Sequence, residues 1–238
     1  MPIKRPPIIT GEIYHIVIKA VDRTKLFRDQ RDYFRMVHDL FEFNDEKPTS
    51  PYYRQEPKHT RTVLVCLEKR HTGRECLVEI LAFCLMSNHV HLLIRQLKDN
   101  GISKFMRKIG AGYGGYYNKK YKRSGHLFQG KYRIVYIKDD QQLITVFVYI
   151  HTNPVALLAP DWKEKGIDKK DLRKIIKFIE DYRWSSYSDY LGKKNFPSLT
   201  TRDFLLNEFG VVKEAQRFVN DWLQTKRELA DLEQVAIE

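Results

Sequence analysis

The chain has 238 residues, of which 42% are hydrophobic and 30% are charged. This composition is sufficient for a real core, and no run approaches the roughly 20 apolar residues of a membrane-spanning helix. The formal net charge is +12, and such an excess favours polyanionic partners, most often nucleic acid. The N-terminus lacks the apolar stretch of a secretory signal, so we expect a cytoplasmic protein with no membrane partner.

Strands and helices are expected to interleave along the first two thirds of the chain. The predicted strands cover residues 13–18, 62–67, 77–86, 89–95 and 131–137. The predicted helices cover residues 32–43, 102–117, 139–152, 169–181, 201–209 and 213–232. Asp139 or Asp140 is the expected N-cap of the helix at 139–152, Pro154 is expected to stop it, and Asp168 is a possible cap of the helix at 169–181.

This order of elements predicts an α+β fold, with an antiparallel sheet of four to five strands and helices packed on one face. We expect one domain over residues 1–191, with an insertion at about 44–75 that contains several prolines. Residues 192–238 form a predicted helical C-terminal extension. From Thr201 to the end it carries eight acidic residues and five Lys or Arg, so we expect this part to pack on the core or to mediate contacts.

The segment from Gly101 to Lys138 contains ten Lys or Arg residues, eight aromatic residues and no Asp or Glu. Positive charge follows phosphates and aromatic rings stack on unpaired bases, so this mixture favours single-stranded or distorted nucleic acid. A solvated basic helix with aromatic residues in the core is the plainer alternative. The candidate DNA contacts are Arg107, Lys108, Lys119, Lys120, Arg123, His126, Gln129, Lys131 and Arg133.

Two histidines, His89 and His91, lie two residues apart in the apolar run from Met86 to Ile94. In a strand, residues i and i+2 point to the same face, so the two imidazoles project side by side. Val90 and Leu92 then point the other way, into a core. Two parallel imidazoles on one strand form a suitable half-site for a divalent metal.

The predicted helix at 139–152 places a tyrosine beside its apolar stripe, which consists of Leu143, Val146, Phe147 and Ile150. Tyr149 and Asn153 are four residues apart and are therefore neighbours on the flank of that stripe. Because Asn153 precedes a proline, it is biased away from helical geometry and is expected just past the last turn. A phenol beside a metal site can attack a phosphodiester, although a tyrosine that merely covers the core is the plainer alternative.

These residues resemble a known family. His89-Val90-His91 looks like the histidine–hydrophobic–histidine (HUH) motif of single-strand DNA nucleases. The segments 127–132 and 149–154 look like the companion motifs of single-tyrosine transposases, in particular the REP-associated tyrosine transposases among the IS200-like transposases. Trp184-Ser185-Ser186-Tyr187 is a further typical segment, and the resemblance covers roughly residues 11–191.

The resemblance implies that Tyr149 is the nucleophile and forms a 5′-phosphotyrosine link, leaving a free 3′-hydroxyl. It implies that His89 and His91 are metal ligands, that Asn153 takes the position of the third ligand, and that the metal is Mg²⁺ or Mn²⁺. The implied substrate is single-stranded DNA that contains hairpins. The insertion and the C-terminal extension are longer than the family pattern requires, which leaves the oligomeric state and the DNA target open.

The leading hypothesis is therefore an enzyme, a metal-dependent single-stranded DNA endonuclease and strand transferase. One alternative is a non-catalytic module that binds single-stranded nucleic acid. Another is a domesticated transposase with a role in the host genome, which differs from a mobile-element transposase only in its flanking DNA. The sequence leaves open whether the protein is a monomer or a homodimer, and whether Tyr149 acts on the metal site of its own chain or of a partner.

Overall fold

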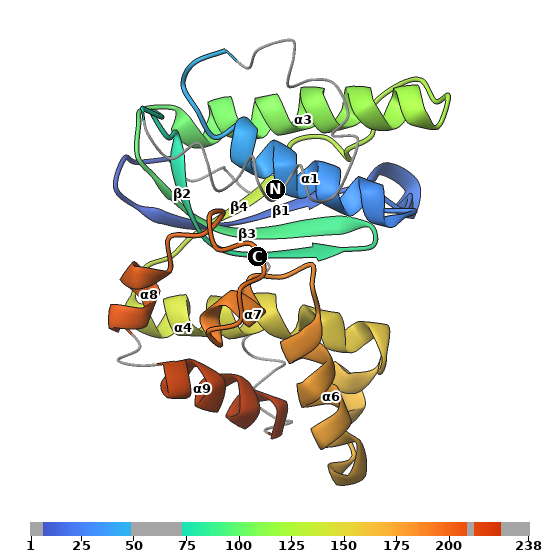
Figure 1. Cartoon of the computed structure of the whole chain (residues 1–238), viewed down its shortest axis with the longest axis vertical. Helices are drawn as coiled ribbons and strands as arrows, with labels where there is room; N and C mark the ends of the chain where they lie inside the picture. The colour runs from blue at the N-terminus through green and yellow to red at the C-terminus, as the bar shows by residue number, and fades with distance from the viewer. Residues whose placement is uncertain (1–6, 49–72, 209–211, 225–238) are drawn as a thin grey trace, which may run out of the picture.

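A central sheet lies between two layers of helices in the computed structural model, which describes residues 7–48, 73–208 and 212–224 (Figure 1). Helices α1 (Gln30–Glu42) and α3 (Gly101–Lys120) cover one face of the sheet. Helix α4 (Asp140–Thr152) lies against the other face, with the remaining C-terminal helices around it. None of the described helices is long and apolar enough to cross a membrane.

The sheet has four strands, all paired antiparallel in the order β2-β3-β1-β4. They are β1 (Ile13–Lys19), β2 (Val78–Met86), β3 (His89–Gln96) and β4 (Arg133–Tyr136). The predicted α+β class and antiparallel sheet are confirmed, and β3 is an internal strand. The strand predicted at 62–67 lies outside the described residues.

Alternation along the strands creates the first core. Tyr14, Ile16 and Ile18 of β1 and the matching positions of β3 face α1 and α3, and all are buried. Helix α1 begins two residues before its predicted start because Asp29 and Asp32 form a reciprocal capping box there.

Helices on one face alone, as the sequence predicts, would leave the second face of β2 in water. Leu81, Ala82 and Cys84 are apolar on that face, and Phe83 and Leu85 are apolar on the first. A strand that is apolar on both sides must be covered on both sides. Helix α4 supplies the second cover, so the one-sided arrangement is corrected to a sheet between two helical layers.

Helix α4 is itself buried on almost every side. Its predicted stripe of Leu143, Val146, Phe147 and Ile150 is buried, and so are Val148 and Tyr149. The helix begins after Asp139, whose side chain accepts a hydrogen bond from the Gln142 amide (2.8 Å), which confirms the predicted cap. Asp168, by contrast, stands at the N-cap position of the next long helix without a side-chain cap bond.

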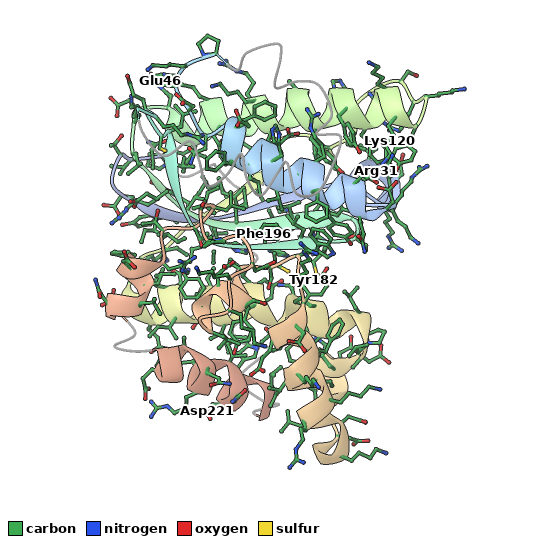
Figure 2. All side chains as sticks on the ribbon, viewed as in Figure 1. Arg31, Glu46, Lys120, Tyr182, Phe196 and Asp221 are labelled. Atoms are coloured by element: carbon green, nitrogen blue, oxygen red, sulfur yellow. The ribbon has the colours of Figure 1, made fainter. Side chains whose placement is uncertain are left out.

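The C-terminal elements complete both cores. They are η3 (Asn153–Leu157), α5 (Trp162–Lys165), α6 (Lys169–Asp181), α7 (Tyr187–Tyr190), α8 (Arg202–Glu208) and α9 (Val212–Gln224). Phe196 is fully buried in the first core and appears between the helical layers, near the sheet (Figure 2). Val219 and Leu223 of α9 are buried in the second core around α4. The described part of the predicted extension therefore shares its packing with the preceding residues.

The segment with Trp184 and Tyr187 covers the outer edge of β2. The Leu85 amide donates to the Trp184 carbonyl (2.8 Å), and the Ser186 amide donates to the Phe83 carbonyl (3.1 Å). The Trp184 ring stacks on Tyr33 with centroids 4.4 Å apart. An exposed strand edge is prone to pair with another chain, and this segment satisfies its backbone groups instead.

The end of α1 approaches α3 closely at Gly112 but not at Gly110. A Cβ at Gly112 would overlap the buried ring of Phe43, whereas a Cβ at Gly110 would meet nothing within 4 Å. We expect Gly112→Ala to destabilise the protein by about 1–3 kcal/mol through overpacking. Gly110→Ala is the matched control and is expected to stabilise it by about 0.5–1 kcal/mol, because alanine favours the helix. Urea unfolding measures both changes, and a shared sign would contradict the steric account.

Candidate active site

His89 and His91 project from the same face of β3, as the spacing predicts. Their ring centroids are 4.8 Å apart, while Val90 and Leu92 between and beyond them are fully buried in the first core. His91 is buried, and His89 is partly exposed at the start of the strand. The strand therefore presents two imidazoles to the face that α4 covers.

A third imidazole, His15 of β1, joins this pair. Its Nε2 lies 3.0 Å from Nδ1 of His91, and the two rings stack with centroids 5.2 Å apart and planes 14° apart. His15 was not predicted from the sequence as part of the site. Alternation does place it on the face opposite Tyr14 and Ile16, but its contact with His91 depends on the β1–β3 register, in which Val17 pairs with His91.

Tyr149 stands over these rings from α4. Its ring centroid lies 5.5 Å from that of His91 and 6.0 Å from that of His15, in both cases in an edge arrangement. The side chain is only 5% exposed, so Tyr149 faces the sheet rather than an open flank. The structure thus brings Tyr149 to the histidines of its own chain.

Asn153 directly follows the last residue of α4, as predicted, and its side chain contacts the backbone of that helix. Its backbone is helical (φ −51°, ψ −39°) and opens the 3₁₀ helix η3, so the predicted bias away from helical geometry is wrong here. Pro154 is tolerated because a proline in the first turn of a helix removes no hydrogen bond. The Asn153 side-chain nitrogen donates to the Tyr149 carbonyl (2.8 Å). Asn153 does not line the pocket next to the histidines.

A small cavity of about 50 Å³ lies between Tyr149 and the sheet. None of the described carboxylates lines it, and the ammonium of Lys163 in α5 lies 4.7 Å from the centre of the Tyr149 ring. Lysine and arginine side chains converge here from different elements, which makes the pocket suited to an anion. The lining residues are His15, Val17, Lys19, His89, His91, Arg133, Val135 and Tyr149.

Burial and these cations keep the two predicted ligands neutral. Desolvation, with Lys19 and Lys163 nearby, lowers the pKa of His89 to about 4. Desolvation also lowers the pKa of His91 well below its usual value, and the neighbouring imidazoles and lysines add to the effect. Both rings are therefore neutral at pH 7, and a neutral imidazole is the form that binds a metal.

The donor atoms fit a divalent metal. His89 Nδ1 donates to Asn88 Oδ1 (2.7 Å), which leaves the Nε2 lone pair for a ligand. His91 Nε2 is buried and has no hydrogen-bond partner among the described residues, an expensive state for an atom that has no further role. In the described parts of the chain, no three His, Cys, Asp or Glu side chains gather closely enough to hold an ion. Other donors would therefore complete the coordination.

The predicted DNA contacts nearest the pocket come from the loop before β4 and from β4 itself. Arg133 lines the pocket, and Lys131 is exposed two residues before it. The Gln129 amide donates to the carbonyl of Lys19 (2.8 Å), whose partner across the sheet is His89. This loop therefore runs past the same end of the sheet as the histidines.

Other predicted contacts are already engaged within the chain. Lys120 pairs with Asp29 and with the buried Asp32, and Figure 2 shows it at the end of the helical layer away from Glu46. Lys108 donates to the Lys47 carbonyl (3.0 Å), and Arg123 donates to the His126 carbonyl (2.9 Å). Arg107, Lys119 and His126 have exposed side chains.

His151, two residues after Tyr149, is structural in this arrangement. It is fully buried, its Nε2 lies 2.8 Å from Ser186 Oγ, and its ring stacks on Tyr187. Burial lowers its pKa to about 3. The unfolded chain, with a histidine pKa near 6.5, therefore binds a proton that the folded chain excludes.

Stability is consequently expected to fall as the pH decreases from about 6.5 toward 3. Each buried neutral histidine contributes a slope of up to about 1.4 kcal/mol per pH unit in this window. His151→Asn removes one such contribution, so the free energy of unfolding of this variant depends less steeply on pH. Urea unfolding at a series of pH values measures the slope, and an unchanged slope would show that His151 titrates normally in the folded state.

Comparisons with known proteins agree with the motifs. The family model described as "Transposase IS200 like" matches residues 58–153, which include His89, His91, Tyr149 and Asn153. This match confirms the resemblance to the IS200-like transposase family. A solved structure described as "Structure of the REP associates tyrosine transposase bound to a REP hairpin" is 14% identical, with a TM-score of 0.49, over 85% of this chain and 93% of that chain. No curated protein matches the sequence.

Proposed function

We propose that this IS200-like transposase relative is a metal-dependent single-stranded DNA endonuclease and strand transferase with Tyr149 as its nucleophile. The observation that carries the proposal is the position of the Tyr149 ring over His91 and His15, in a cationic pocket that no carboxylate lines. A tyrosine that only completed a core would have no need of three imidazoles beneath it and a lysine over its ring.

The pocket is suited to a phosphodiester. Lys19, Arg133 and Lys163 surround it closely enough that Arg133 and Lys163 help to lower the pKa of Lys19, after the larger effect of desolvation. An anion reduces the repulsion between like charges that are held close together, and a DNA phosphate is such an anion. A phosphate held here lies between the sheet cations and the Tyr149 side chain.

The chemical step is a transesterification. The Tyr149 phenol oxygen loses its proton and bonds to phosphorus, the bond from phosphorus to the 3′-oxygen breaks, and that oxygen takes up a proton. The products are a 5′-phosphotyrosine and a free 3′-hydroxyl, and reversal on a second strand end gives strand transfer. Lys163 and Arg133 offset the negative charge that develops on the phosphate oxygens during the exchange.

His89 and His91 would hold the divalent metal through Nε2, and Asn153 stays the predicted third ligand. When bound, Mg²⁺ or Mn²⁺ withdraws charge from the phosphodiester and orients it. For Asn153 to contribute its amide oxygen, the side chain has to turn from the Tyr149 carbonyl that its nitrogen now contacts. The chain's own residues supply the nucleophile, the positive charge and the exclusion of water around the phenol.

The basic segment before β4 gives the proposal its DNA partner. Gln129, Lys131 and Arg133 follow one another past the end of the sheet where His89 begins β3. We assign them to the strand that enters the pocket, with the exposed Lys119 and Arg107 of α3 further away on the other layer. Single-stranded DNA that contains a hairpin is the proposed substrate.

Covalent trapping tests the nucleophile. Wild-type protein mixed with Mn²⁺ and 5′- and 3′-labelled hairpin DNA from the flanks of its own gene is expected to give a DNA–protein adduct on a denaturing gel. Tyr149→Phe is expected to give none, because the attacking oxygen is absent. Tyr187→Phe is the matched control, since its buried hydroxyl has no hydrogen-bond partner, and it is expected to keep the adduct. Tight binding without an adduct in the wild type would favour the non-catalytic binding module.

A mixing experiment tests whether the nucleophile and the histidines act within one chain. Tyr149 contacts His91 of its own chain, so neither Tyr149→Phe nor His91→Ala contains a complete site. We expect a mixture of the two variants to form no adduct above that of the separate proteins. Restored adduct would mean that α4 can serve the histidines of a partner.

A further inference from the structure

We infer that His15 is a positioning residue that fixes His91 for metal binding and sets the edge of the pocket on which Tyr149 packs. The inference rests on the proposed function, because it concerns the same site. No motif contains His15, and only the β1–β3 pairing brings it to His91. Its role is indirect, since it would hold the ligand and would not bind the ion.

His15 and His91 are in direct contact. His15 is 1% exposed, and its Nε2 lies 3.0 Å from His91 Nδ1, within the range of an N–H···N hydrogen bond. The two ring planes are within 14° of each other. This buried hydrogen bond between nearly parallel rings restricts rotation of the His91 ring.

The contact with His15 also selects the tautomer of His91. A neutral imidazole carries one N–H, so His91 can offer Nε2 to a metal only when its proton is on Nδ1. Nδ1 then donates to His15, and His15 Nε2 is the acceptor. Supporting groups of this kind orient metal-binding histidines and raise their basicity. The free, buried Nε2 of His91 is the atom that this arrangement leaves for the ion.

His15 also contacts the proposed nucleophile. The His15 ring also lies against Tyr149, with centroids 6.0 Å apart and planes at 76°. His15 therefore contacts both the proposed ligand and the proposed nucleophile, in addition to the direct contact between His91 and Tyr149. Truncation of His15 would loosen His91 and leave a space beside Tyr149.

Two amide substitutions separate this role from simple core packing. In His15→Gln, the longer side chain places its amide near the position of Nε2 and can accept from His91 Nδ1. In His15→Asn, the same group is one methylene shorter and does not reach. Binding of Mn²⁺ to the DNA-free protein, measured by electron paramagnetic resonance, is the readout. We expect His15→Asn to weaken Mn²⁺ binding by about 10- to 100-fold and His15→Gln to restore most of it.

Nitrogen chemical shifts of the His91 ring provide a second signature. Wild type and His15→Gln are expected to show the Nδ1–H tautomer, and His15→Asn a mixture of tautomers. His38→Asn is the matched control and should leave Mn²⁺ binding unchanged. His38 is a buried histidine of α1, on the opposite face of the sheet.

The outcomes are distinguishable. Equal Mn²⁺ affinity in wild type and His15→Asn, or equal losses in the Asn and Gln variants with the fold intact, would overturn the role of His15 and leave the proposed reaction standing. A wild-type protein that forms the DNA adduct only through Tyr149 but binds no Mn²⁺ would overturn both the metal site and the role of His15. Wild-type Mn²⁺ binding without any adduct would count against the proposed reaction alone.

Discussion

The packing of α4 against the second face of the sheet is the contact on which the site depends. That face changes character along its width. It is apolar on β2, where Ala82 and Cys84 meet the buried side of α4, and it carries histidines, a lysine and an arginine on β1, β3 and β4. The apolar half fixes the helix, and the helix carries Tyr149 over the polar half. Burial of the α4 stripe thus supplies the free energy that holds a phenol above three imidazoles, since these side chains are costly to desolvate without compensation.

The electrostatics follow from the same arrangement. A low-dielectric pocket strengthens the repulsion between Lys19, Arg133 and Lys163 and keeps His89 and His91 in their neutral form. Neutral imidazoles bind a metal, while fixed cations without a carboxylate among the lining residues favour an anion. The same pocket therefore suits both partners of the proposed reaction, a divalent metal and the phosphodiester. Elsewhere, lysines of the basic segment are neutralised internally, as Lys120 is by Asp29 and Asp32, so the high net charge overstates the surface available to DNA.

Local patterns were sufficient for most elements and for part of the site. Period-two alternation predicted the shared face of His89 and His91, and helical spacing predicted the buried stripe of α4. Local patterns could not predict contacts between segments that are distant in the sequence. His15 reaches His91 only through strand register, and Lys163 reaches Tyr149 only through the turn that follows η3. The one-sided helical cover failed because the apolar run of β2 was not recognised as a strand buried on both faces. Asn153 lies just past the last turn of α4, as predicted, but its backbone is helical because the 3₁₀ turn tolerates the proline.

The size of the pocket adds a constraint on the reaction. A cavity of about 50 Å³ is small beside a phosphodiester with its flanking sugars. In the proposed reaction, side chains around the pocket would therefore move as the DNA strand enters. The sheet histidines and α4 are held by packing on both sides, whereas Lys19 is exposed and Lys163 partly so at the rim. Long cationic side chains are the groups that can shift at least cost and follow the phosphate as they do so. Lys19 and Lys163 at the rim of the pocket would then be the first side chains to contact the incoming strand.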